Sequence, residues 1–148
     1  MIYLVHHADA VGPDVEPQRP LSVTGKDHAE ALALEVARRG VKPAVIWHSG
    51  KLRARQTAEP FLRLCNPLAE FSAIRGLQPA DPPGWIKDQV TGEHREVMLV
   101  GHMPNLPRLL TLLVTGSETS SLSFPLHGAI ALEAAGELWV ERWRIWRI

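Results

Sequence analysis

Histidines follow three short apolar runs of this chain, and imidazole is the side chain whose charge changes near neutral pH. The polar residues at the ends of these runs are His6 and His7, then His48 and Ser49, and finally His102 after Gly101. A neutral imidazole can act as a nucleophile or as a general base. Two adjacent histidines directly after an apolar run therefore indicate a chemical role rather than packing alone.

The apolar runs have the length and β-branched content of strands that are covered on both faces. Strands are predicted at Ile2–Val5, Ala44–Trp47 and residues 96–102, and helices at residues 24–40, 52–65 and 106–116. Residues 11–22 and 76–84 are proline-rich and are predicted to be loops. Two further strands, at residues 128–134 and 137–146, are expected to pair antiparallel around Ala135 and Gly136.

Three features of the predicted helices depend on single residues. Thr24 is expected to cap the first helix and Asn105 to cap the third, because hydroxyl and amide oxygens accept from free first-turn amides. Pro60 is expected to kink or interrupt the second helix, since proline lacks an amide hydrogen.

Alternation of strands and helices predicts the α/β class, as a three-layer α/β/α sandwich with a mostly parallel central sheet and an antiparallel C-terminal strand pair. Residues 1–148 are expected to form a single domain. In such sheets, sites form at the carboxyl ends of the strands. The histidines that follow the strands should therefore converge at one edge.

The composition argues against several classes of partner. The 148 residues carry 16 basic and 16 acidic side chains, and this balance favours neither nucleic acid nor an anionic membrane as a partner. No signal peptide or run of about 20 apolar residues is evident. The single cysteine, Cys65, cannot form an internal disulfide. We therefore expect a cytoplasmic protein that binds no nucleic acid and no membrane.

Four segments, taken in order, resemble the histidine phosphatase superfamily, and in particular its small SixA-type phosphohistidine phosphatase branch. They are "VHHADA", Arg19-Pro20-Leu21-Ser22, "HSGKLRARQT" and "VGHMPNLPRLL". The family's Ser-x-x-x-Arg-Ala-x-Gln-Thr pattern is matched by Ser49, Arg53, Ala54, Gln56 and Thr57. The resemblance spans roughly residues 1–115 and implies a phosphoglycerate mutase-like fold.

The resemblance also implies roles for particular side chains. His7 would be the nucleophile that becomes phosphorylated, Arg53 and Arg19 would hold phosphate oxygens, and His102 would supply a second imidazole. His6 and Ser49 are further candidates for phosphate binding. These residue types suit phosphoryl transfer, because imidazole can attack phosphorus and guanidinium forks match phosphate oxygens.

The resemblance implies a metal-independent phosphohydrolase that uses a phosphohistidine intermediate and needs no cofactor or metal. A phosphoprotein is the expected substrate, with phosphohistidine on a signalling domain favoured over a small phosphate ester. Asp81 is the candidate general acid. An imidazole leaving group readily carries its own proton, so an N-phosphorylated substrate demands less of such an acid.

The chain departs from the family where the first motif has Arg-His and this sequence has His6 before His7. Loss of one good transition-state donor typically costs about 3–4 kcal/mol. A bound dianion is expected to raise the pKa of His6 and restore part of the charge. The departure predicts weakened catalysis or a different substrate, and it leaves open a pseudoenzyme that binds phosphate or docks a phosphoprotein.

A metallohydrolase is a further alternative, because His6, His7, Asp9 and His102 are residue types that bind zinc. Arg19 and Arg53 in the same pocket disfavour a cation. His48 is expected to contact the residues that bind the ligand, without binding it itself, or to lie at the surface. His127 precedes a predicted strand and could border the cleft.

Overall fold

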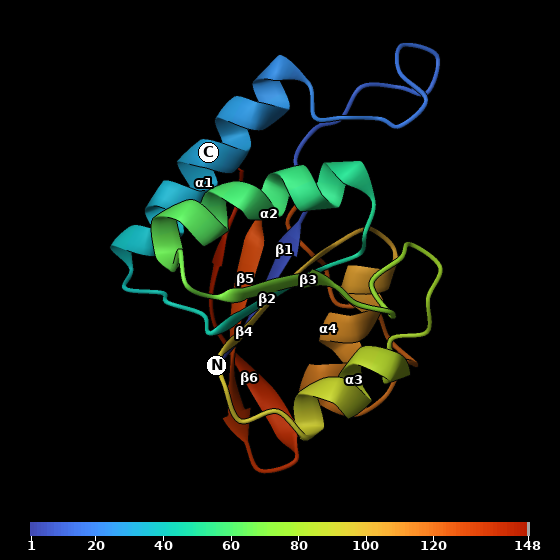
Figure 1. Cartoon of the computed structure of the whole chain (residues 1–148). Coiled ribbons are helices and arrows are strands. Elements are labelled where there is room, and N and C mark those ends of the chain that lie inside the picture. The colour runs from blue at the N-terminus through green and yellow to red at the C-terminus, as the bar shows by residue number, and fades with distance from the viewer. Residues whose placement is uncertain (148) are drawn as a thin grey trace.

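The computed structural model describes residues 1–147, and within them a six-stranded sheet lies between two layers of helices (Figure 1). The elements are β1 (Ile2–His6), α1 (Val23–Arg38), β2 (Val45–His48), α2 (Leu52–Cys65), β3 (Glu70–Ala73), α3 (Gly84–Thr91), β4 (Val97–Gly101), α4 (Asn105–Thr115), β5 (Ala129–Ala135) and β6 (Leu138–Ile145). The predicted three-layer α/β/α sandwich is confirmed. No helix in this part of the chain is long and apolar enough to cross a membrane.

The sheet has the strand order β3-β2-β4-β1-β5-β6. The pairs β1·β4, β2·β4 and β2·β3 are parallel, whereas β5 runs antiparallel to both β1 and β6. A mostly parallel sheet with an antiparallel C-terminal pair is therefore what the chain forms, as the sequence predicts.

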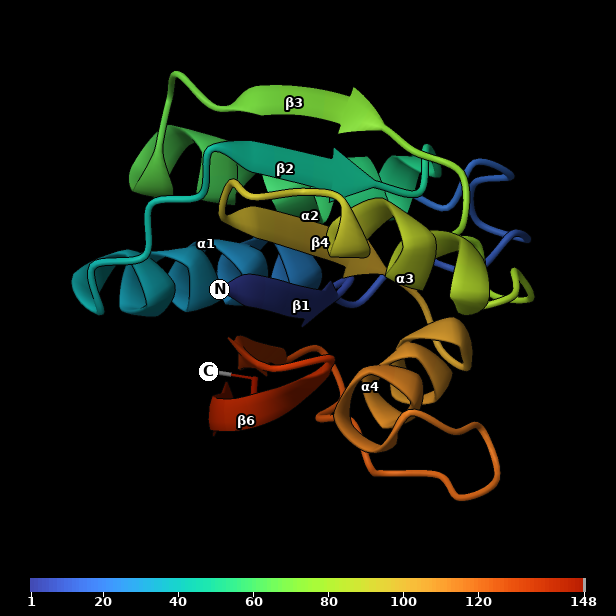
Figure 2. The same cartoon turned by 90° about the horizontal axis from the view of Figure 1, so that it is seen from below.

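Alternate residues of the central strands point to opposite faces of the sheet and pack into two separate hydrophobic cores. On one face, Ile2 and Leu4 pack with residues of α3 and α4 such as Leu109. On the other face, Tyr3 and Val5 pack with residues of α1 and α2. Figures 1 and 2 show α1 and α2 on one side of the sheet and α3 and α4 on the other. Burial on both faces explains why these strands read as continuous apolar runs.

The parallel register brings the carboxyl ends of the central strands to one edge. His6 pairs with Gly101, and His48 pairs with Val100. His7 follows β1, and its amide donates to the Gly101 carbonyl at 3.0 Å. Segments that are about a hundred residues apart in sequence are thereby fixed side by side at the point where both strands end.

The predicted cap of the first helix is wrong, and so is an interruption of the second helix. Helix α1 begins at Val23 and is capped by Ser22 rather than Thr24, because the Ser22 hydroxyl accepts from the Gly25 amide at 2.9 Å. Helix α2 continues through Pro60 as one element from Leu52 to Cys65, so the proline does not interrupt it.

Two elements were not predicted. Strand β3 lies at the edge of the sheet, and its residues are mostly exposed, so it lacks an apolar run. Helix α3 begins at Gly84, at the end of the predicted loop, and buries only Ile86 and Val90. Both elements are too short and too polar to give a periodic signal.

Candidate functional site

The histidines at the carboxyl edge of the sheet form a contiguous group. The ring centroid of His7 lies 4.5 Å from that of His6 and 5.0 Å from that of His102. His6 and His102 are buried, whereas His7 is partly exposed. The structure therefore brings together the three histidines that sequence spacing places at the ends of β1 and β4, and it leaves the central one reachable from solvent.

Hydrogen bonding defines the tautomer of His7. Its Nδ1 lies 2.7 Å from the carbonyl oxygen of Ala8. A carbonyl oxygen can only accept, so Nδ1 carries the hydrogen and Nε2 keeps a lone pair. Burial lowers the pKa of His7 to about 4, and the nearby Arg53 charge also lowers it, against the opposing effect of the Ala8 hydrogen bond. His7 is thus neutral and nucleophilic at Nε2 at neutral pH.

His102 and Ser49 are joined across the ends of β4 and β2. The Ser49 hydroxyl lies 2.6 Å from Nε2 of His102, and both residues are buried. Within residues 1–147, Nδ1 of His102 is buried without a hydrogen-bond partner. Ser49 therefore orients this imidazole, and Nδ1 is the nitrogen that has no protein partner in this part of the chain.

Two guanidinium groups lie close to the histidines. The charges of Arg53 and Arg19 both lower the pKa of His7 and of His102, so the two guanidinium groups lie near enough to act on both imidazoles. Burial lowers the pKa of Arg53, and the neighbouring Arg19 lowers it further. Two adjacent cations with neutral imidazoles and no carboxylate between them form a pocket suited to an anion.

The Gln and Thr of the Arg53 segment hold the two loops that flank the pocket. Thr57 accepts from the Ala8 amide at 2.9 Å through its hydroxyl. Gln56 accepts from the Leu21 amide at 2.7 Å through its side-chain oxygen. Helix α2 therefore supplies Arg53 and also fixes the segment that follows His7 and the loop that carries Arg19.

His6 is held in the opposite tautomer to His7. The backbone amide of His127 donates to Nδ1 of His6 at 2.8 Å, so this nitrogen must keep its lone pair and the hydrogen sits on Nε2. Burial lowers the pKa of His6 to about 2, and the charges of the neighbouring histidines and Arg53 lower it further. The expectation that a dianion would charge His6 does not fit this bonding. His6 offers one neutral donor.

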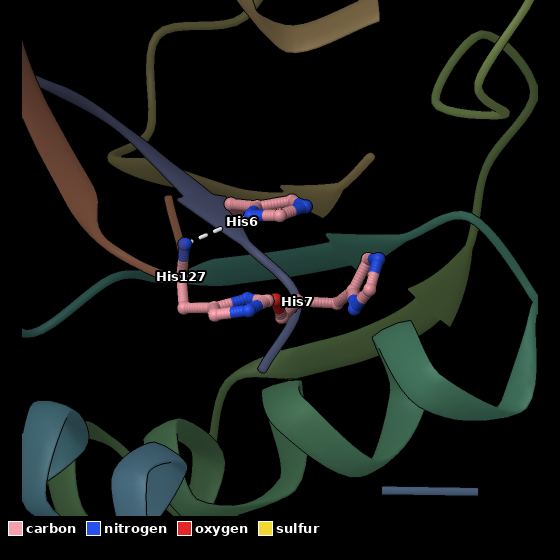
Figure 3. Close-up of side chains that lie close together, drawn as sticks. All are labelled: His6, His7 and His127. Carbon is pink, nitrogen blue, oxygen red and sulfur yellow. Dashed lines mark hydrogen bonds between the residues drawn. The ribbon is translucent and has the colours of Figure 1, made fainter. Parts of the chain in front are cut away.

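His127 is the member of this group that sequence reasoning indicates only weakly. Its ring stacks on that of His6 at 4.9 Å with an interplanar angle of 3°. Its Nδ1 lies 2.7 Å from the carbonyl oxygen of His7. Figure 3 shows the His127 ring extending from its backbone toward His7. Its place before a strand that pairs with β1 was the one available clue.

A ring nitrogen of each of His6, His7 and His127 lies within 4.8 Å of the others, which is a spacing that could hold a metal ion. The hydrogen bonding argues against this use. With Nδ1 of His6 accepting from a backbone amide, a metal on Nε2 would require a doubly deprotonated ring. The donor set therefore does not fit a metal, and Asp9 of the metallohydrolase alternative instead accepts from the Ser22 hydroxyl at 2.7 Å.

Asp81, the candidate general acid, lies in the loop before α3. One of its carboxylate oxygens accepts from the amides of Gly76 and Gln78 at 3.1 and 3.0 Å. The Gln78 side chain in turn donates to the Ser49 carbonyl at 2.8 Å. This bonding stabilises the loop next to Ser49.

Asn105 and His48 hold nearby backbone. The Asn105 amide group donates to the carbonyls of Gly76 and Asp81, so the predicted cap of α4 is wrong and the residue ties this helix to the Asp81 loop. His48 is buried, and its Nδ1 accepts from the Gly50 amide at 3.0 Å. It shapes the turn after β2.

The buried neutral histidines predict sensitivity to acid. Burial lowers the pKa of His6 to about 2 and of His102 to about 3, below the value of about 6.5 in an unfolded chain. Between these values the unfolded chain binds protons that the folded protein does not. The free energy of unfolding is therefore expected to fall below about pH 6.5, by about 1.4 kcal/mol per pH unit for each group.

Urea denaturation at a series of pH values measures this slope. His6→Gln should make the slope shallower, whereas His94→Gln, at an exposed position, should leave it unchanged. An equal slope in wild type and His6→Gln would contradict the assignment of His6 as a buried neutral group.

Comparison with known proteins gives one family and one fold. The model of the histidine phosphatase superfamily (branch 1) matches residues 2–96, which is more than half of the chain. No curated protein matches the sequence. The matched range contains the segments of His7, Arg19 and Arg53 and ends before His102.

Solved structures extend the similarity over nearly the whole chain. A protein histidine phosphatase SixA complexed with tungstate has a TM-score of 0.85 at 21% identity, covering 97% of this chain and 95% of that one. A putative phosphohistidine phosphatase SixA from Agrobacterium tumefaciens has a TM-score of 0.77 at 26% identity, with the same coverage. An alpha-ribazole-5'-P phosphatase from Escherichia coli, also putative, has a TM-score of 0.71 at 14% identity, covering 95% and 93%.

Proposed function

Because the chain belongs to the histidine phosphatase superfamily, we propose that it is a phosphohydrolase that passes a phosphoryl group through His7 and acts on phosphohistidine carried by a signalling protein. The observation that carries the proposal is the hydrogen bond from Nδ1 of His7 to the Ala8 carbonyl, which leaves a lone pair on Nε2. A neutral imidazole beside two guanidinium groups is the arrangement that nucleophilic attack on a phosphoryl group requires.

In the first step, the Nε2 lone pair of His7 attacks phosphorus, and the bond from phosphorus to the substrate nitrogen breaks. The electron pair of that bond leaves with the substrate imidazole, which takes up a proton. Arg53 and Arg19 donate to the peripheral oxygens of the transferring group, and His102 donates through Nδ1. These donors act by position and charge, which supply most of the catalysis of phosphoryl transfer.

In the second step, water attacks the phosphorus on His7. The bond to Nε2 breaks and its electron pair returns to the ring. Inorganic phosphate leaves with the water oxygen as a hydroxyl group, and the other proton of the water passes to solvent. No metal takes part in either step. The neutral ring is regenerated in the same tautomer, because Nδ1 keeps its hydrogen and donates it to the Ala8 carbonyl throughout.

Two features favour a substrate phosphorylated on nitrogen. One carboxylate oxygen of Asp81 already accepts from two backbone amides, which leaves this side chain less free to deliver a proton to an alkoxide leaving group. The solved structures with this fold include SixA proteins described as histidine phosphatases. An imidazole leaving group suits a pocket that offers no strong acid.

The test compares hydrolysis of a phosphohistidine protein and of a phosphoserine protein by the purified chain, followed by phosphorus NMR and repeated after chelation. We expect kcat/KM to be at least about tenfold higher for phosphohistidine, since the serine alkoxide needs a proton donor. Chelation should change neither rate. A preference for phosphoserine, or loss of activity on chelation, would contradict the proposal.

The neutral His6 supports a second candidate, which is a phosphoprotein-docking module with little turnover. Lacking a permanent charge at this position, the pocket can bind a phosphoryl group without stabilising its transfer well. His6→Arg separates the two: a large gain of turnover would indicate an attenuated or specialised enzyme. No turnover in either protein, with phosphate binding retained, would favour the docking module.

A further inference from the structure

His127 has an unusual backbone that the fold alone does not require. Within residues 1–147, Arg19 and His127 are the non-glycine residues with positive φ, at 52° and 54°. This left-handed region is unfavourable for most side chains, and such residues gather at functional sites. Arg19 belongs to the anion pocket. His127 lies next to it, although nothing in the family pattern includes this position.

The hydrogen bonding of His127 leaves one nitrogen free for a ligand. Its Nδ1 donates to the His7 carbonyl at 2.7 Å, and its backbone amide donates to Nδ1 of His6. Nε2 is therefore the nitrogen that can take up or release a proton. His127 is partly exposed, whereas His6 is buried.

The position of His127 suits the side of a phosphoryl group rather than its leaving atom. Its ring centroid lies 6.0 Å from that of His7, and a ring nitrogen of each residue lies within 4.8 Å of the other. In an in-line displacement the leaving atom departs on the side opposite the nucleophile, whereas the peripheral oxygens lie beside it. A donor this close to His7 is therefore placed to meet a peripheral oxygen rather than the leaving atom.

We propose that His127 binds the phosphoryl group through Nε2 and supplies, as an imidazolium, the positive charge that the arginine of the family motif would bring. In this arrangement His6 and His127 together supply the hydrogen-bond donors and the positive charge of that arginine. His6 is the fixed neutral donor, and His127 is the charged one. The inference rests on the proposed phosphoryl site.

Titratable and charged groups lie on the pocket side of His127. The surrounding groups are His6 and His7 at the end of β1, His102 after β4, and beyond His7 the guanidinium groups of Arg19 and Arg53. The two guanidinium groups oppose a further positive charge, and a dianion reverses that effect. Anion binding is therefore expected to bring a proton with it.

Isothermal titration with sulfate tests this, because sulfate stays a dianion across the neutral range. Titrations in buffers of different ionisation enthalpy should show that wild type takes up close to one proton as sulfate binds. His127→Asn keeps a residue that tolerates positive φ. It should bind sulfate roughly tenfold to a hundredfold more weakly and take up almost no proton, whereas His94→Asn should behave as wild type.

Equal proton uptake in wild type and His127→Asn would overturn the proposal, as would equal sulfate affinity. Nitrogen NMR of the wild-type imidazoles gives an answer even if the variant folds poorly: His127 should become an imidazolium when sulfate binds, and His6 should stay protonated on Nε2 alone. A neutral His127 in the complex would also overturn it. Sulfate binding needs no turnover, so failure of the phosphatase proposal would be seen separately in the hydrolysis assay.

Discussion

His7→Ala should abolish both labelling of the protein by a phosphodonor and hydrolysis of phosphohistidine. The substitution removes the atom that forms the covalent intermediate, and loss of a nucleophile typically lowers kcat by on the order of 10⁴ to 10⁶. Acid-quenched labelling measures the first effect and phosphorus NMR the second. The phosphoryl group on nitrogen is acid-labile, so quenching has to be brief.

His94→Ala is the matched control, because His94 is exposed and lies in the segment after α3. It should label and turn over as wild type does. Phosphate binding should survive in His7→Ala, since Arg19 and Arg53 remain. Labelling of His7→Ala at the wild-type level would show that another residue accepts the phosphoryl group, and the assignment of the nucleophile would then be wrong.

The central strands and the convergence of their ends could be predicted because burial on both faces leaves a direct mark in the sequence. Ile2 to Val5 form a continuous apolar run, and the parallel register then places His6 beside Gly101 and next to His102. Once strands of this kind alternate with helices, the edge at which their ends meet follows from topology.

Strand β3 and the bonding of His6 could not be predicted in the same way. Glu70 to Ala73 form an edge strand with little burial, so no hydrophobic pattern marks it. The tautomer of His6 depends on the amide of His127, which is 121 positions away in the chain. A spacing argument can bring residue types together, but it cannot say which nitrogen of a ring is already occupied.

The local supports of the site were also hidden from sequence. Ser22 and Thr24 both carry hydroxyl groups near the start of α1, and only the position of the Gly25 amide shows that Ser22 is the cap. Asn105 could be read as a cap because asparagine favours that position. In the fold, two carbonyls of the Asp81 loop lie within reach of its side chain.

The turn before β5 holds the histidine cluster, and Gly128 is the residue that allows it. Its carbonyl accepts from the His6 amide at 3.0 Å, and its own amide donates to the Pro125 carbonyl at 3.0 Å. A Cβ added here would overlap the carbonyl oxygen of Ile145 on β6 and lie 2.8 Å from Cβ of Pro125. Backbone on one side and a proline ring on the other leave no flexible group to move aside.

Gly128→Ala is therefore expected to lower the free energy of unfolding by about 3 kcal/mol, at the upper end of the usual cost of overpacking. It should also weaken sulfate binding in the molecules that remain folded. Movement of the turn away from Ile145 and Pro125 would displace His127 and the amide that holds His6. Gly92→Ala is the matched control, since an added Cβ there meets no atom within 4 Å and φ is −90°.

Urea denaturation and sulfate titration of the two glycine variants separate the effects. A loss of stability in Gly128→Ala with unchanged sulfate affinity would mean that the turn supports β5 and β6 but not the anion pocket. Unchanged stability would contradict the packing argument itself, because the turn would then have room for a side chain. The expected result is a loss of both stability and sulfate affinity. It would show that the position of the histidines depends on the absence of a side chain at Gly128.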